Sequence, residues 1–323
     1  MSEAVMFRQD EWLSFLSVAK QNKNTEPGLQ TACFLRGLNM QQHTLAQTVE
    51  INGIGLHSGL PSKLVLHPAE ANTGIVFVRS DLPSKPSFKA LYSQVVDTRN
   101  CTCLGDADKN VVSTIEHLMS VLYILGIDNV RIEVSNPELP ILDGSAEKLY
   151  QTLKKIPLVE QNAPRKYLKV LKNIVFTDNN GNSVSLSPTD DVLKINFTIE
   201  FPSPIVGHQE FHGSITENLF VSEIAPCRTF CEKSQIDYLQ SIGLIKGGSL
   251  ENALVLDGDK VLNPDGMKNP HECVNHKVLD AIGDMYTSGF FIIGELTAMK
   301  TGHFHNNELL KKLFSDNSNY KLV

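Results

Sequence analysis

The order of strand-like and helix-like segments repeats once along this chain, and this repetition constrains the fold more than any other feature. Short apolar runs separated by glycine and proline turns occupy residues 44–78, and a helical pattern follows over residues 113–126. After a proline-containing stretch, residues 157–165, strand-like runs return, and a second long helix is expected over residues 271–288. Strands followed by helices in each half predict an α+β protein with two domains of similar design.

The chain length supports the same division. With 323 residues, the chain exceeds the size at which single hydrophobic cores usually stop growing, about 250–300 residues. We expect a first α+β domain over residues 40–160 and a second over residues 161–323. Residues 1–39 lack this pattern, and we expect an N-terminal extension that is disordered or reflects an upstream start. A strand over residues 290–299 and a last helix over residues 306–315 are expected to close the second domain.

Composition and charge exclude several classes of protein. The net charge of −7 argues against nucleic-acid binding, which usually needs a basic stripe. The longest apolar stretches, such as residues 118–127, are shorter than the roughly 20 residues of a membrane span, so no transmembrane segment is expected. No secretory signal is evident, and the six cysteines contain no CxxC pair. Free thiols in a reducing cytosol are therefore expected, which predicts a cytoplasmic protein.

Three polar clusters could carry chemistry. His276 and Asp280 are four residues apart on an expected helix, so they share one face and could bind Zn²⁺, although a solvated polar stripe has the same spacing. Glu116 and His117 also suit a metal site. Ser113 and Glu116 nevertheless match a helix capping box, which needs no catalysis.

The third cluster, KTGHFH over residues 300–305, is expected in the turn after a strand. His303 in this turn could be a general acid, a third metal ligand or an exposed loop residue.

Taken together, these segments resemble one family, the UDP-3-O-acyl-N-acetylglucosamine deacetylases of lipid A biosynthesis. The resemblance begins near Met40 and keeps the same order to the final helix. The matching stretches are GIGLHSG (53–59), HPAEANTGIVF (67–77), CTCL (101–104), STIEHLMSVLYILGIDN (113–129), PELPILDGSA (137–146), RTF (228–230), VLNPDG (261–266), HKVLDAIGD (276–284) and KTGHFHNN (300–307).

The resemblance implies a fold and a set of active-site residues. The family fold has two βα sandwiches, each with a small insert, and the active site lies between their helical layers. The zinc ligands fall on His117, His276 and Asp280. The catalytic residues fall on Glu116 as general base, His303 as general acid, Asp284 as the partner of that histidine, and Thr229 as an oxyanion donor. The substrate-binding residues fall on Lys277 and Lys300 near the diphosphate and on Phe230. In the family the insert of the second domain forms the channel for the acyl chain, which here corresponds to residues 241–263, and Leu250, Ala253 and Val255 are its candidate lining residues.

The implied reaction is zinc-dependent hydrolysis of the N-acetyl group of UDP-3-O-acyl-N-acetylglucosamine. Its products are UDP-3-O-acyl-glucosamine and acetate, and it is the committed step of the pathway. We expect a monomer that acts on this small molecule. Two alternatives stay open: a catalytically silent relative that binds UDP-sugars, and a zinc amidase for another acylated amino sugar. Three residues depart from the family pattern: His305, which forms an HxH with His303 and could compete for metal, and Lys233 and Asn252 near the expected acyl channel.

Overall fold

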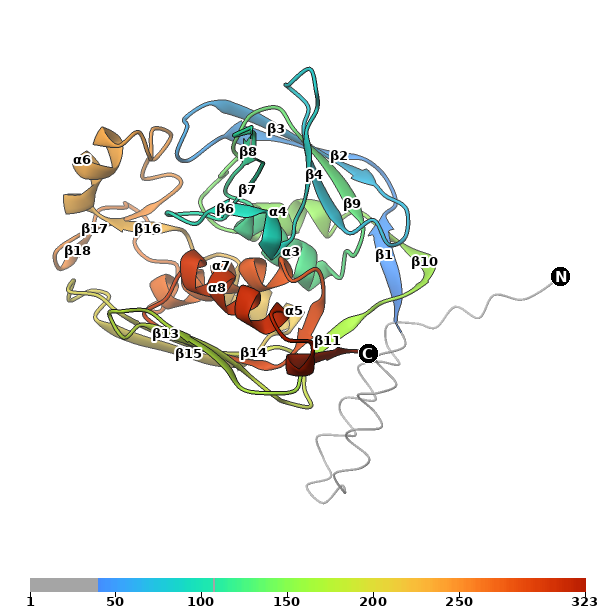
Figure 1. Cartoon of the computed structure of the whole chain (residues 1–323). Coiled ribbons are helices and arrows are strands. Elements are labelled where there is room, and N and C mark those ends of the chain that lie inside the picture. Colours follow the sequence, from blue (N-terminus) through green and yellow to red (C-terminus); the bar gives the residue numbers. More distant parts are fainter. Residues whose placement is uncertain (1–39, 107) are drawn as a thin grey trace. The chain divides into compact units, whose positions relative to one another are not determined.

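The computed structural model describes residues 40–323, except residue 107, and residues 40–323 form one compact unit. The prediction for residues 1–39 lies outside the described residues. Sheets pack against helices throughout the described chain, so the predicted α+β class is confirmed (Figure 1). No helix in this part of the chain is both long and apolar enough to cross a membrane.

Each half of the chain contributes one five-stranded sheet. The first sheet has the spatial order β2 (Val49–Ile54), β3 (Pro61–Pro68), β9 (Val130–Val134), β4 (Ile75–Arg79), β5 (Ser87–Lys89). The second has the order β12 (Ile174–Thr177), β13 (Ser183–Ser187), β20 (Glu295–Met299), β14 (Lys194–Glu200), β15 (His208–Ser214).

The two sheets share one topology. In each sheet the third and fourth strands are parallel, and all other neighbours are antiparallel. Alternate residues of the strands are buried, as in β14, where Ile195, Phe197 and Ile199 all point into the core. The repeated order seen in the sequence therefore corresponds to a repeated sheet topology.

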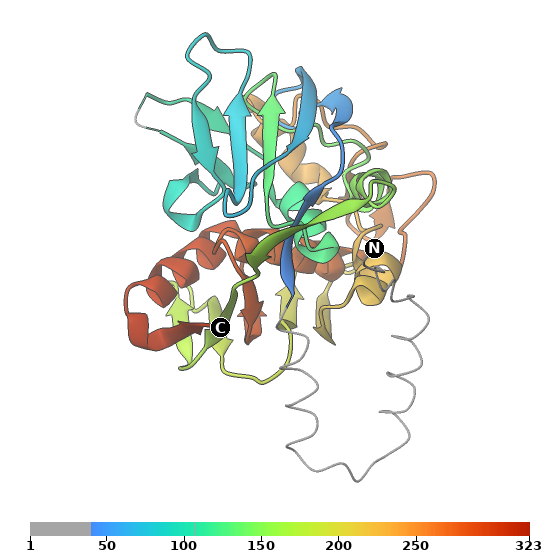
Figure 2. The ribbon, with the colours of Figure 1, turned by 90° about the vertical axis from the view of Figure 1, so that its right-hand side faces the viewer.

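Four helices lie between the two sheets: α3 (Glu116–Leu125), α4 (Glu147–Leu153), α7 (Glu272–Tyr286) and α8 (His303–Phe314) (Figures 1 and 2). Helices α3 and α7 cross so closely that a Cβ atom on Gly283 would lie 2.0 Å from the carbonyl oxygen of Glu116. Almost every residue of α7 is buried, including its polar ones. Buried polar groups need partners, so the polar residues of α7 must be satisfied by one another or by a ligand.

Each half also carries a small three-stranded sheet. In the first half it consists of β6 (Val95–Asp97), β7 (Cys103–Gly105) and β8 (Val111–Val112). In the second half it consists of β16 (Phe230–Glu232), β17 (Leu254–Asp257) and β18 (Lys260–Val261), beside helix α6 (Lys233–Ser241). These two sheets correspond to the inserts that the resemblance implies.

The remaining strands pair near the ends of each half. Strand β1 (Gln41–Leu45) pairs with β10 (Leu158–Pro164), and β11 (Tyr167–Val170) lies between β19 (Phe291–Ile293) and β21 (Tyr320–Leu322). The expected boundary at residue 160 falls within β10, and the domain limits stay a prediction. The short helices are η1 (Tyr92–Gln94), α5 (Glu217–Leu219), η2 (Phe220–Ile224) and η3 (Asn317–Asn319).

Two predictions about single elements were wrong. The strand expected over residues 290–299 is two strands in different sheets, because the chain bends at Gly294. A side chain there would meet Val170 Cγ2 at 2.8 Å, so the close approach of β11 requires glycine. The last helix begins at His303 rather than at residue 306, so His303 lies in the first turn of α8 and not in the preceding loop.

The predicted capping box at the start of α3 was also wrong. Thr114 has a positive φ of 60°, which turns the chain immediately before the helix. The hydroxyl of Ser113 therefore donates to the carbonyl of Pro137 at 3.1 Å, and the carboxylate of Glu116 accepts from the backbone N–H of Thr102 instead.

Candidate active site

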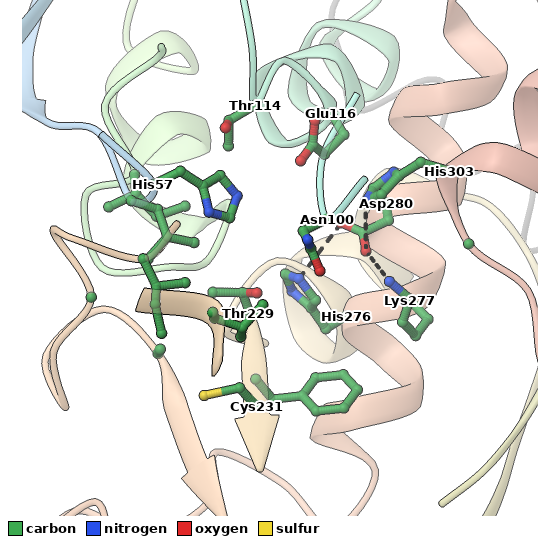
Figure 3. Close-up of a pocket in the computed structure, with 18 of the residues that line it drawn as sticks. His57, Asn100, Thr114, Glu116, Thr229, Cys231, His276, Lys277, Asp280 and His303 are labelled. Carbon is green, nitrogen blue, oxygen red and sulfur yellow. Dashed lines mark hydrogen bonds and ion pairs between the residues drawn. The ribbon is translucent and has the colours of Figure 1, made fainter. Parts of the chain in front are cut away.

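The three predicted metal ligands lie close together where α3 crosses α7. His276 and Asp280 lie one turn apart on α7 (Figure 3). His117 lies in the first turn of α3. Asp280 Oδ1 is 3.5 Å from His276 Nε2 and 3.7 Å from His117 Nε2. Each of the three offers a donor atom within 4.8 Å of the others. The helical spacing predicted from the sequence therefore places two of the three ligands on α7, and α3 supplies the third.

The donor chemistry of this cluster fits a divalent metal. Burial lowers the pKa of His117 to about 3 and also lowers that of His276, so both rings are neutral, the form that binds metal. His276 Nδ1 is 3.1 Å from the carbonyl of Cys227, which directs Nε2 toward the cluster. Burial opposes the charge of Asp280, but Lys277 and the nearby histidines outweigh it and hold its pKa well below the usual value. Two neutral imidazoles and a carboxylate are a typical set of zinc ligands.

Glu116 and His303 stand beside this cluster. Glu116, Asp280 and His303 also offer donor atoms within 4.8 Å of one another. Burial raises the pKa of Glu116 to about 8, against the pull of the His303 charge. Burial also disfavours a charged His303, but the carboxylates of Asp284 and Asp280 outweigh it and raise the pKa of His303 to about 9. A carboxyl group and an imidazole that titrate in this range suit proton transfer near neutral pH.

The carboxylate of Asp284 organises the histidine. Asp284 Oδ2 is 2.8 Å from His303 Nδ1 and accepts from Asn306 Nδ2 at 2.9 Å, while Oδ1 accepts from the hydroxyl of Thr102 at 2.5 Å. The predicted pairing of Asp284 with His303 is present in this geometry. Thr102 and Asn306 were missed by the sequence reasoning, although they lie within the matching stretches CTCL and KTGHFHNN.

A cavity of about 730 Å³ opens over these groups. Thr229 lies directly before β16 and faces the cavity opposite α7 (Figure 3). Every residue predicted to bind substrate lines this cavity: Lys277, Lys300, Phe230, Leu250, Ala253 and Val255. One part of the cavity lining is apolar and comes from α6, β17 and neighbouring residues; this part, here called the apolar arm, is lined by Ile236, Leu239, Leu250, Ala253, Val255 and Leu262.

The comparison with known proteins decides the family. A family model described as LpxC, UDP-3-O-acyl N-acetylglycosamine deacetylase, matches residues 42–315. The chain belongs to this deacetylase family. A UDP-3-O-acyl-N-acetylglucosamine deacetylase from Aliarcobacter butzleri is 42% identical over 288 residues, covering 88% of this chain and 93% of the relative. Deacetylases of the same name from Haemophilus ducreyi (41% identical; 88% of this chain, 93% of the relative) and Shewanella violacea (44%; 87% and 92%) are similarly close. The resemblance seen in the motifs is confirmed.

The three departures from the family pattern have separate explanations in the structure. His305 Nε2 is 3.0 Å from Asp178 Oδ2, and His305 belongs to neither group of potential metal ligands in the described chain. Lys233 does line the cavity and forms an ion pair with Asp257 at 2.8 Å. Asn252 is buried in a turn, where its amide donates to the carbonyl of Gly247, so this residue serves the backbone of the insert.

His57 is a cavity residue that the sequence reasoning missed. Its backbone N–H donates to Glu138 Oε1 at 2.7 Å, which fixes the GIGLHSG loop, and Figure 3 shows its ring across the cavity from Asp280. Both ring nitrogens are buried and have no hydrogen-bond partner among the described residues. Burial lowers the pKa of His57, so the ring is neutral. The only signal available was its place inside a matching stretch.

Proposed function

We propose that this chain hydrolyses the N-acetyl group of UDP-3-O-acyl-N-acetylglucosamine with one zinc ion held by His117, His276 and Asp280. The products are UDP-3-O-acyl-glucosamine and acetate. The observation that carries the proposal is the position of this ligand cluster beside Glu116 and His303, in the lining of a cavity that also has an apolar arm. The enzyme acts as a cytoplasmic monomer, and its two sandwich domains meet near residue 160.

Glu116 and His303 divide the proton transfers. When bound, zinc supplies Lewis-acid chemistry, which lowers the pKa of water and polarises the amide carbonyl. The carboxylate of Glu116 takes the proton of the attacking water. Its Oε2 accepts from the Thr102 N–H at 3.0 Å, which holds the carboxylate beside the cluster. His303 then gives the Nε2 proton to the leaving amine, while Nδ1 stays bound to Asp284 at 2.8 Å.

Other residues bind the substrate. Thr229 offers its hydroxyl to the developing oxyanion. Lys300 and Lys277 face the same cavity and attract the diphosphate, after exchanging their ion pairs with Glu200 and Asp280.

The apolar arm receives the acyl chain. Leu250, Ala253 and Val255 line it together with residues of α6, which shields a hydrocarbon from water. Phe230 also lines the cavity, and its ring centroid is 6.3 Å from that of His276. The acyl group is therefore held next to the reacting amide.

The test measures acetate release from the acylated UDP-sugar and from its non-acylated counterpart, in the presence of zinc and after chelation. We expect release from the acylated substrate only, and loss of release on chelation. Glu116→Gln provides the matched control, because it keeps the shape of the side chain and removes the base. No release from either sugar would indicate a silent UDP-sugar-binding relative. Equal release from both, or from other acylated amino sugars, would indicate a different amidase.

A further inference from the structure

Thr102 connects several groups of the active site through its three polar groups. Its backbone N–H donates to Glu116 Oε2 at 3.0 Å. Its carbonyl accepts from the N–H of Ile115, immediately before α3, at 3.4 Å. Its hydroxyl donates to Asp284 Oδ1 on α7 at 2.5 Å. One residue next to strand β7 therefore contacts the first half of the site through its backbone and the second half through its side chain.

The hydroxyl of Thr102 completes the surroundings of a buried carboxylate. Asp284 Oδ1 accepts a hydrogen bond from the hydroxyl of Thr102, and Oδ2 lies within hydrogen-bond distance of His303 Nδ1 and accepts from Asn306 Nδ2. The hydroxyl oxygen also lies 3.3 Å from His303 Nδ1. Thr102, Asp284 and His303 are each at least nine-tenths buried, so water does not replace a lost partner easily. The orientation of this carboxylate sets the direction in which the other ring nitrogen of His303 points.

We propose that Thr102 is a positioning residue that keeps the Glu116 carboxylate and the Asp284–His303 pair aligned across the two halves of the site. The inference rests on the proposed function, because alignment matters only if Glu116 and His303 transfer the protons. Proton transfer depends on reacting atoms meeting at hydrogen-bond distance, and a displacement of about 1 Å can cost about 100-fold in rate. Threonine suits this role because its branched side chain has few rotamers.

Three variants of Thr102 separate the hydroxyl from the shape of the side chain. Thr102→Val keeps the shape and removes the donor, Thr102→Ala removes the donor without placing a methyl group against the carboxylate, and Thr102→Ser keeps the donor. We expect Val and Ala to lower kcat about 10- to 100-fold with little change in KM, since a lost hydrogen bond to a charged group has effects of this size. Ser should stay within about threefold of the parent enzyme. Zinc content should be unchanged in all three.

Thr44→Val is the matched control. Thr44 lies in β1, away from the residues that line the cavity. Its hydroxyl is also buried and donates to the carbonyl of Asn129 at 2.7 Å. This variant should lose thermal stability as Thr102→Val does, while its kcat stays that of the parent enzyme. If Thr102→Val does not fold, Thr102→Ala takes its place in the comparison.

A double-mutant cycle with Asp284→Ala tests whether Thr102 acts through that carboxylate. In the Asp284→Ala background, Thr102→Val should add less than about a threefold loss of kcat, because its partner is gone. A full additional loss overturns the inference, and so does a Thr102→Val enzyme with the kcat of Thr44→Val. The variants Glu116→Gln and His303→Ala show whether a negative result contradicts the proposed function or only the inference about Thr102. If both keep full activity, the proposed function and this inference fall together; if both lose activity while Thr102→Val does not, only the inference falls.

Discussion

The crossing of α3 and α7 at Gly283 predicts the effect of one added methyl group. A Cβ at position 283 would lie 2.0, 2.7 and 2.9 Å from the carbonyl oxygen, carbonyl carbon and Cα of Glu116. All three are backbone atoms, so no side-chain rotation relieves the clash. Non-bonded carbon atoms prefer separations of about 3.5–4.0 Å, so the two helices must separate by about 1 Å.

Moving the two helices apart should change the stability of the protein, its zinc affinity and its kcat. In an unobstructed helix interior, Gly→Ala stabilises by about 1 kcal/mol, whereas overpacking a core costs about 1–3 kcal/mol. We therefore expect Gly283→Ala to lower the Tm instead of raising it. Because His117 follows Glu116 on α3, both move away from His276 and Asp280. Zinc affinity should fall, and kcat at saturating zinc should drop about 100-fold, the cost of a displacement of about 1 Å.

The assay compares the Tm, the zinc affinity from chelator competition and the kcat of Gly283→Ala with those of Gly213→Ala. The control places a Cβ 2.9 Å from Leu219 Cδ2, the end of a flexible side chain that can rotate away. Gly213→Ala should therefore keep its zinc affinity and rate. A Gly283→Ala protein that gains stability and keeps both its zinc affinity and its rate would refute the argument that this contact sets the geometry of the site.

Three further outcomes are expected. His276→Ala should lose zinc and activity together, while His303→Ala should keep its zinc and lose about 10²–10⁴ in rate. Elemental analysis and single-turnover kinetics measure the two effects. The reverse pattern would show that His303 is the metal ligand and His276 the general acid. The profile of kcat/KM against pH should be bell-shaped, because the rate rises as Glu116 ionises and falls as His303 loses its proton. Both limbs should lie below the pKa values of about 9 for His303 and about 8 for Glu116, because a bound cation favours the carboxylate and disfavours the protonated imidazole. A profile without a falling limb contradicts the acid assignment. A protein that starts at Met40 should fold and turn over normally, as judged by circular dichroism and acetate release, because every matched segment follows it.

The sequence predicted elements well where the pattern is local. His276 and Asp280 share a face because of their helical spacing, and the long helix that carries them runs from Glu272 to Tyr286. The position of His117 opposite them is a tertiary relation, which the resemblance implied and residue spacing did not.

Contacts between distant residues account for what the sequence reasoning missed. Thr102 is 182 residues from Asp284, and no local pattern indicates that their side chains meet. The capping box failed for a similar reason: its two residues found partners elsewhere in the fold, at Pro137 and at Thr102. At Gly294 the chain packs against Val170 of β11, a tertiary contact that the continuous apolar run around it does not indicate.

The pairing of the outer strands has a consequence for synthesis on the ribosome. In the first half, β1 finds its partner β10 by residue 164, so this half can complete its pairing while the rest of the chain is still being made. In the second half, β11 pairs with β19 and β21, and its second partner arrives only with residues 320–322. We expect protease resistance to appear in two steps, one on the ribosome after residue 164 emerges and one only after the finished chain is released. Because His117 belongs to the early half and Asp280 to the late one, zinc should bind only after the second step.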